Sequence, residues 1–356
     1  MIESITGFGR INVGNLRRME NKSQAISKNF SKPLKYVCLT HNDLDACGCV
    51  AVLEETLKPI KYFHTNYADL HEKIFELTEY CKENRISNVI IADVALSQCR
   101  DSLIQLQRDL KNISPNSDFK IFDHHLYDDN FWHGVTAEIH IDKSRCAAKM
   151  LFDYFNTSNS LNFMADFIRT VNLYDIYLKD EADFLNSLIL NEQFFGFINK
   201  KSENILLYTK EAKKNNFNVS TLMGDFKYNY KNEFETLKNT LKLEKKYIRS
   251  NKGVKTTVIL SWDLFPFFTY FEMKSGQDVV IGVKYGIFKI RVKEGVFSEN
   301  ALNKIRKKLC GDANYGHSLA FTYKADVPNK DAVIAELIRI SDVFNSYKEN
   351  WWKYKF

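Results

Sequence analysis

Residues 36–57 have the sequence YVCLTHNDLDACGCVAVLEETL, in which a strand pattern is followed directly by a helix pattern. Tyr36–Thr40 is a short apolar run, and apolar residues recur at helical spacing from Ala46 to Leu57. The polar segment His41-Asn-Asp-Leu-Asp45 stands between them. Side chains alternate along an extended chain, so we expect His41, Asp43 and Asp45 to lie on one side. A buried strand that leads into a helix is the unit from which parallel α/β sheets are built.

The same alternation continues along the chain. A polar helix pattern at 70–84 leads to an apolar strand at 88–92, and a second helix pattern at 99–110 leads to a strand at 119–122. Short apolar strands that alternate with helices predict a mostly parallel sheet covered by helices on both faces.

The length of 356 residues suggests about two domains. We expect an α/β protein with two lobes, divided into an N-terminal extension (1–33), a catalytic lobe (34–178), a helical connector (179–252) and a smaller α/β lobe with a C-terminal helix (253–356). The last connector helix is expected to run from Phe234 to Ile248, and Asp142 or Ser144 to cap the helix that follows position 146. Strands at 256–262, 278–285 and 288–293 and helices at 298–309 and 328–347 are expected in the smaller lobe.

Composition excludes several classes of protein. The net charge of +6, from 50 basic and 44 acidic residues, is too small for a dedicated binder of duplex DNA. Seven cysteines show neither a disulfide framework nor paired zinc-ligand spacing. No apolar run approaches the roughly 18 to 20 residues of a membrane span, and no secretory signal precedes the first strand. We therefore expect a cytoplasmic protein with no membrane partner.

Acidic residues and histidines follow each of the early strands. Asp93 follows the strand at 88–92, and Asp123-His124-His125 follows the strand at 119–122. Ligands bind at the carboxyl ends of the strands in open α/β sheets, so these groups should converge with those after Thr40. Clustered carboxylates repel one another unless a cation neutralises them. An oxygen-rich set with imidazoles favours Mn²⁺ over zinc, with Mg²⁺ as the other choice, and is large enough for two ions.

These motifs resemble those of the DHH phosphoesterases. His41-Asn-Asp-Leu-Asp45, Asp93 and Asp123-His124-His125 are similar to the first three motifs, and Asn172-Leu-Tyr-Asp175 is similar to the fourth. The connector and the small C-terminal lobe resemble the DHHA1 arrangement. Within the family the chain looks closest to the NrnB-type oligoribonucleases, which degrade very short RNA, and the resemblance spans about Lys35 to Pro328.

The resemblance implies two divalent cations that share one bridging carboxylate. The implied ligands are His41 and Asp43 at one ion, Asp45, His124 and Asp175 at the other, and Asp93 between them.

The resemblance also implies residues that act beside the ions. Asp123 would orient a ligand, and His125 would face the scissile phosphate. In the C-terminal lobe, Arg291 matches a substrate-facing arginine, and Gly316-His317 resembles the end of a glycine-rich substrate motif. This chain has Asp312-Ala-Asn-Tyr315 where that motif has glycines, which changes the expected phosphate cradle.

Simpler explanations exist for individual residues. The first acidic loop could be an Asx turn that caps the following helix, and Asp175 could be a solvated residue at a helix end. Arg291 and His317 could be an ordinary surface pair. Turn chemistry explains one such loop but not three, which favours the metal site.

The expected function is a metal-dependent phosphodiesterase, a hydrolase and exonuclease that cuts short single-stranded oligonucleotides, RNA in particular, to mononucleotides. One alternative is a phosphatase or phosphodiesterase for a small nucleotide such as 3′-phosphoadenosine 5′-phosphate or a cyclic dinucleotide. Another is a non-catalytic DHH protein that binds nucleic acid. The expected partner is short single-stranded RNA or DNA, or a small nucleotide, and the sequence leaves a homodimer open.

Overall fold

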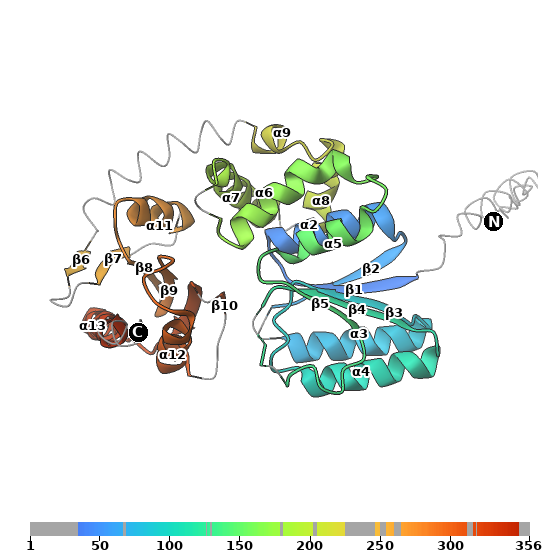
Figure 1. Ribbon diagram of the computed structural model, residues 1–356, viewed down its shortest axis with the longest axis horizontal. Coiled ribbons are helices and arrows are strands. Elements are labelled where there is room, and N and C mark those ends of the chain that lie inside the picture. The colour runs from blue at the N-terminus through green and yellow to red at the C-terminus, as the bar shows by residue number, and fades with distance from the viewer. Residues whose placement is uncertain are drawn as a thin grey trace, which may run out of the picture.

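The computed structural model describes most of the chain and divides it into two lobes (Figure 1). The described residues are 35–66, 69–125, 127–128, 130–178, 181–201, 205–224, 246–249, 254–259, 265–311, 316–317 and 319–348. The expected N-terminal extension, residues 1–33, lies outside them, as does most of the segment expected to form the last connector helix. Among the described residues, no helix combines the length and the apolar character needed to cross a bilayer.

A five-stranded parallel sheet forms the centre of the first lobe. Its strands are β1 (Tyr36–Thr40), β2 (Ile60–His64), β3 (Asn88–Ala92), β4 (Asp118–Asp123) and β5 (Glu138–Ile141), in the order β2-β1-β3-β4-β5. The carboxyl ends of all five strands therefore lie at one edge of the sheet. The expected α/β class with two lobes is confirmed.

Helices cover both faces of this sheet (Figure 1). On one face lie α3 (Leu70–Asn84) and α4 (Arg100–Ile113), and on the other α2 (Leu44–Thr56) and α5 (Ala147–Phe155). Side chains alternate between the two faces of the sheet, so each strand contributes to two hydrophobic cores. Val37 and Leu39 belong to the first core, with α3 and α4, and Cys38 belongs to the second core, with α2 and α5. Six of the seven cysteines are buried, as expected for small apolar residues rather than redox groups.

The helices after the sheet extend the second core. They are α6 (Ala165–Asp175), preceded by the turn η1 (Asn162–Met164), α7 (Phe184–Lys201), α8 (Ile205–Lys214) and α9 (Val219–Met223). Helix α7 packs on α6, and α8 packs on α2. The first helices of the expected connector therefore belong to the hydrophobic core of the first lobe.

The second lobe contains a mixed sheet in the order β10-β11-β9-β8-β7-β6. Its strands are β6 (Lys246–Arg249), β7 (Lys255–Ile259), β8 (Val279–Lys284), β9 (Ile287–Val292), β10 (Gly316–His317) and β11 (Ala320–Lys324). Helices α12 (Glu299–Cys310) and α13 (Lys330–Lys348) contribute to the core on one face, whereas Tyr270 and Met273 of α11 (Phe265–Lys274) join the core of the first lobe. The two lobes thus share apolar contacts around α11.

Some sequence expectations were wrong. Ile248 lies in β6, which pairs antiparallel with β7, and is not in a helix; pairing with the sheet overrides the helical spacing. Strands β2, β5 and β11 and helix α11 were not predicted. Neither Asp142 nor Ser144 caps α5, because Asp142 instead forms an Asx turn in which its carboxylate accepts from the Ser144 amide at 2.8 Å.

Candidate metal centre and substrate cleft

The loop after β1 orients the first acidic motif. Asp43 is the N-cap of α2: its Oδ1 accepts a hydrogen bond from the Ala46 amide at 3.0 Å. Its Oδ2 lies 2.9 Å from His41 Nδ1. The helix cap therefore fixes the carboxylate in place while the imidazole holds its second oxygen. The structural explanation for this loop therefore holds, and the same residue also belongs to the acidic cluster.

Asp45 connects the first turn of α2 to α5. Its two carboxylate oxygens accept hydrogen bonds from the Ala147 and Ala148 amides, each at 2.9 Å. Two of the otherwise unpaired amides at the N-terminus of α5 are thereby satisfied by a residue far earlier in the chain. Asp45 is buried, and its carboxylate also lies within 4.8 Å of ligand atoms of Cys146 and Asp175.

Asp93 lies at the centre of the site and has unusual backbone geometry. Its φ of 57° is in the left-handed region, and its amide donates to Phe122 O at 3.0 Å. The side chain is 3% exposed, and its Oδ2 has no hydrogen-bond donor among the described residues. A strained, buried carboxylate with an unsatisfied oxygen indicates a functional group rather than a structural one.

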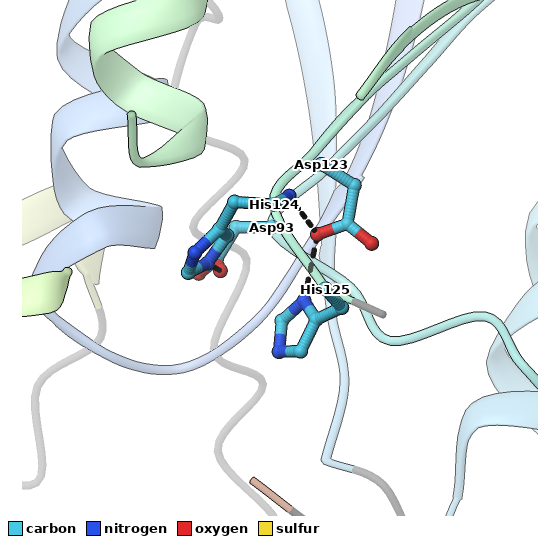
Figure 2. A group of neighbouring side chains, drawn as sticks. All are labelled: Asp93, Asp123, His124 and His125. Carbon is cyan, nitrogen blue, oxygen red and sulfur yellow. Dashed lines mark hydrogen bonds and ion pairs between the residues drawn. The ribbon is translucent and has the colours of Figure 1, made fainter. Parts of the chain in front are cut away.

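The Asp123-His124-His125 triplet extends from the end of β4 into the same space (Figure 2). His124 Nε2 lies 3.3 Å from Asp93 Oδ1 and 3.2 Å from Asp175 Oδ2. His124 therefore brings together the carboxylates that follow β3 and that end α6.

Asp123 points away from the carboxylates and anchors the triplet. Its Oδ1 accepts from the His124 amide at 2.8 Å and lies 2.7 Å from His125 Nδ1 (Figure 2). Its Oδ2 accepts a hydrogen bond from the Tyr127 hydroxyl, which in turn accepts from the Leu96 amide at 3.1 Å. These contacts hold Asp123 in place and engage Nδ1 of His125, which leaves Nε2 of that ring directed toward the cleft.

The expected ligands fall, together with three further residues, into three groups, and within each group the possible ligand atoms lie within 4.8 Å of one another. The groups are His41, Asp43 and Asp93; Asp93, Asp123, His124 and His125; and Asp45, Cys146 and Asp175. Asp93 is common to the first two groups, and the 3.2 Å contact between His124 and Asp175 connects the third group to them, so all six expected metal ligands converge.

Three of the carboxylates, Asp45, Asp93 and Asp175, are destabilised as anions. Burial, reinforced by Asp175, raises the pKa of Asp45 to about 7, and burial, reinforced by Asp43, raises that of Asp175 to about 8. Burial and the three neighbouring carboxylates raise the pKa of Asp93 well above its usual value. Burial would also raise the pKa of Asp43, but His41 beside it lowers that pKa below its usual value.

These properties fit a divalent metal centre. Carboxylates with raised pKa values, imidazoles and an unsatisfied buried oxygen are the groups that a cation would stabilise. The oxygen-rich donor set suits hard divalent ions such as Mn²⁺ or Mg²⁺.

The centre opens into a cleft between the lobes of about 440 Å³. His41, Asp43, His124, His125 and Asp175 line one wall. Lys289 and Arg291 of β9, with Leu319 and Ala320, line the other. Phe288, Ile290 and Val292 of the same strand belong to the core of the second lobe, so alternation directs the two cations toward the cleft.

The backbone register of β10 places the end of the glycine-rich motif, Gly316-His317, beside β11. His317 of β10 lies opposite Ala320 of β11, which lies opposite Arg291 of β9. His317 and Arg291 thus share one register across three strands. The described residues do not include 312–315, so the altered part of the motif lies outside them.

Sequence reasoning missed several residues at this site. Cys146, Tyr127, Lys289 and Asn191 all touch the centre or line the cleft. Only Lys289 had a usable signal, because it stands two residues before Arg291 on a strand with alternating apolar positions.

Comparisons with known proteins agree with this arrangement at the level of the fold. No protein-family model and no curated protein matches the sequence. Among solved structures, the DHH domain of a protein described as a member of a family of ribosomal proteins matches with a TM-score of 0.59 and 13% identity, covering 92% of this chain and 91% of that chain.

Two enzymes with solved structures are also similar. RecJ in complex with Mn²⁺ from Thermus thermophilus matches with a TM-score of 0.51 and 12% identity, covering 94% of this chain and 55% of RecJ. The pGpG-specific phosphodiesterase PggH from Vibrio cholerae matches with a TM-score of 0.50 and 14% identity, covering 88% of this chain and 100% of PggH. The parallel sheet, its flanking helices and the second lobe therefore give this chain the fold shared by the DHH superfamily.

Proposed function

We propose that the protein is a metal-dependent phosphodiesterase that hydrolyses short single-stranded oligonucleotides, RNA in particular, to mononucleotides. The observation that carries the proposal is the convergence of six acidic and histidine side chains, with Asp93 among them, at one edge of the parallel sheet. The fold is shared by RecJ, whose structure contains Mn²⁺, and by a pGpG-specific phosphodiesterase, which supports a metal-dependent hydrolase of this class.

The side chains would hold two divalent ions through the ligands named above, with Asp93 shared. Bound ions of this kind activate a water and stabilise the charge that develops on phosphate oxygens. His125, held by Asp123 at 2.7 Å, directs its other nitrogen toward the substrate phosphate. Burial lowers the pKa of His125, but the charge and the hydrogen bond of Asp123 outweigh burial and raise that pKa, so the ring carries a proton more readily than a free imidazole.

The opposite wall supplies charge for the substrate. Lys289 and Arg291 face the acidic centre across a single cleft. A phosphodiester placed between the two walls would meet these basic side chains on one side and the bound divalent ions on the other. The size of the cleft supports a short substrate, since about 440 Å³ falls in the range of small-molecule sites. PggH acts on a dinucleotide, which agrees with short chains.

The small-nucleotide alternative has one observation in its favour. The glycines that would cradle a terminal phosphate in the resembling family are replaced at 312–315 by bulkier residues. A changed cradle favours a changed terminal group, such as that of 3′-phosphoadenosine 5′-phosphate or a cyclic dinucleotide.

One assay separates these functions. The protein would be incubated with labelled di- to pentaribonucleotides, their DNA counterparts, 3′-phosphoadenosine 5′-phosphate and a cyclic dinucleotide, with Mn²⁺, Mg²⁺ or EDTA. We expect metal-dependent release of mononucleotides from the oligoribonucleotides, and no reaction in EDTA. Reaction with the small nucleotides alone would establish the alternative. Tight binding without any reaction would favour the non-catalytic protein.

A further inference from the structure

Outside the acidic centre, one polar side chain of the cleft is buried with an oxygen that has no hydrogen-bond partner among the residues that the structure describes. Asn191, on α7, is 2% exposed and lines the cleft between the lobes. Its Oδ1 has no hydrogen-bond partner within the described part of the chain. A buried amide oxygen that has left water without gaining a donor destabilises the folded protein, so such atoms are rare and call for a reason.

The packing of α7 does not require an asparagine at this position. The flanking positions Leu188, Leu190 and Phe194 are buried apolar residues of the core. A leucine has nearly the same shape as asparagine and would fit the same pattern without an unsatisfied atom. A ligand that brings an N–H group into the cleft would account for the amide.

The surroundings of Asn191 suit the flat apolar part of a nucleotide rather than its phosphate. Tyr177 and Phe195 line the same cleft, and Thr269 lies on α11. The cations of β9 and the acidic centre already provide the phosphate contacts. An aromatic surface with a single amide is the usual composition of a base site, where stacking supplies affinity and one amide supplies selectivity.

We propose that Asn191 recognises the nucleobase of the substrate by accepting a hydrogen bond from a base N–H, and that it favours adenine. An asparagine amide can pair with adenine in a bidentate manner, accepting from N6 and donating to N7. This inference rests on the proposed function, because it assigns the base of the same substrate whose phosphate the metal centre would bind. An isolated water could also satisfy Oδ1, but it needs two to four polar partners of its own.

Base analogues test the proposal directly. The dinucleotide pApA would be compared with the same dinucleotide built from purine riboside, which lacks the 6-amino group, and from 7-deazaadenosine, which lacks the N7 acceptor. For the wild type we expect kcat/KM for pApA to exceed that for the purine analogue by about 10- to 100-fold. In Asn191→Leu this ratio should fall to within about twofold of one.

Two further measurements exclude a purely structural role. The melting temperature of Asn191→Leu should equal or exceed that of the wild type, because the substitution removes an unsatisfied buried oxygen. Asn186→Leu, on the same helix beside Asp183 and not a lining residue of the cleft, is the matched control and should keep the wild-type ratio. A wild-type ratio below twofold, or a ratio that Asn191→Leu leaves unchanged, would overturn the proposal.

Binding separates this inference from the proposed function. The affinities of pApA and the purine analogue would be measured by fluorescence anisotropy for the metal-free wild type and for the metal-free Asn191→Leu variant. A preference for pApA that depends on Asn191, in a protein that hydrolyses none of the substrates, would keep the base site and remove the phosphodiesterase. Hydrolysis with equal affinity and equal rate for both dinucleotides would keep the phosphodiesterase and exclude the base site.

Discussion

The two walls of the cleft are made from different kinds of backbone. Most of the acidic wall consists of loops at the carboxyl ends of parallel strands, and Asp175 joins it from the end of α6. A main-chain hydrogen bond fixes the Asp43 carboxylate, and the Asp93 backbone is held in the left-handed region. The basic wall is one face of β9, and α7 contributes Asn191 beside it. Strand ends converge by topology alone, whereas a sheet face and a helix meet only when two lobes pack.

Because the two walls differ in this way, we expect them to have different roles in hydrolysis and in substrate selection. The acidic wall is rigid and chemically specific, and its carboxylates are costly to bury without cations. The basic wall offers charge and shape that can change with little consequence for the metal centre. Substitutions on the first wall should therefore abolish hydrolysis, and those on the second should alter which substrate binds.

The largest effect is expected for Asp93→Asn. Asparagine tolerates the left-handed backbone at φ 57° but cannot bridge two cations as an anion. We expect kcat/KM to fall by at least about 1,000-fold. The melting temperature in EDTA should stay the same or rise, since a buried carboxylate with a raised pKa is removed. Asp101→Asn, at the exposed start of α4, is the control. Retention of a tenth of the activity would exclude Asp93 as a shared ligand.

Arg291→Ala should have the next largest effect and should act on binding. Removing a charge-assisted hydrogen bond to phosphate is expected to raise KM by about 10- to 100-fold with a smaller change in kcat. The slope of log KM against log salt should fall by about 0.7 for each phosphate that the variant no longer neutralises. Lys304→Ala, on the exposed face of α12, should leave both quantities unchanged. A loss of kcat with unchanged KM would instead mean that Arg291 acts in the chemical step and not in substrate binding.

The same contrast explains which parts of the molecule could be predicted from sequence. Motifs on consecutive strand ends need only the rule that parallel strands place their carboxyl ends together, and β1, β3 and β4 appeared where expected. The edge strands β2 and β5 were missed, because they lack the continuous buried apolar runs of β1 and β3: polar residues interrupt β2, and no residue of β5 is fully buried.

Residues and contacts whose positions depend on tertiary packing were harder to predict on both walls. Asn191 stands in an ordinary amphipathic helix, and only its place in the cleft makes it notable. The hydrogen bonds from Asp45 to α5 join distant parts of the sequence, so no local pattern indicates them. Tyr127 likewise reaches Asp123 from a turn with no motif.

The stability of the metal-free protein should depend on pH through the acidic wall. The pKa values of Asp45 and Asp175 are raised to about 7 and about 8, so the folded state binds protons that the unfolded state releases above about pH 4. The contribution of these two carboxylates to stability is then fully present below about pH 4 and is lost as the pH rises through about 7 and about 8. Between about pH 5 and about pH 8 we expect the melting temperature in EDTA to fall by roughly 2 to 5 °C.

Saturating Mn²⁺ should reverse this trend, because ionised carboxylates bind cations better than protonated ones. Scanning calorimetry at several pH values measures both slopes. Asp175→Asn should flatten the decline in EDTA. An EDTA curve that rises over the same pH range would show that these carboxylates are ionised in the folded protein without metal.

Tyr127→Phe should weaken the support of the acidic wall without removing a ligand. Without the hydrogen bond to Asp123, the free energy of unfolding is expected to fall by about 1 kcal/mol, and kcat by about 3- to 10-fold, as His125 becomes less firmly held. Urea unfolding and steady-state kinetics measure the two effects. Tyr154→Phe is the control, since its hydroxyl lies 3.4 Å from an exposed carboxylate of Glu138. An unchanged kcat would show that Asp123 holds His125 without Tyr127.

The smallest effect is expected where the two lobes meet at the surface. Lys143, beside the acidic wall, pairs with Glu299 of the second lobe at 3.5 Å, and both side chains are about 60% exposed. Exposed ion pairs contribute little, so this pair should not hold the lobes together. Glu299→Gln removes a negative charge from the lining of the cleft and leaves Lys143 to attract phosphate. We therefore expect kcat/KM to rise by less than about twofold at low salt, and the gain to vanish near 1 M salt, where screening acts within about 3 Å. A fall in kcat/KM that persists at high salt would instead mean that contact between the lobes, and not charge alone, sets the geometry of the basic wall.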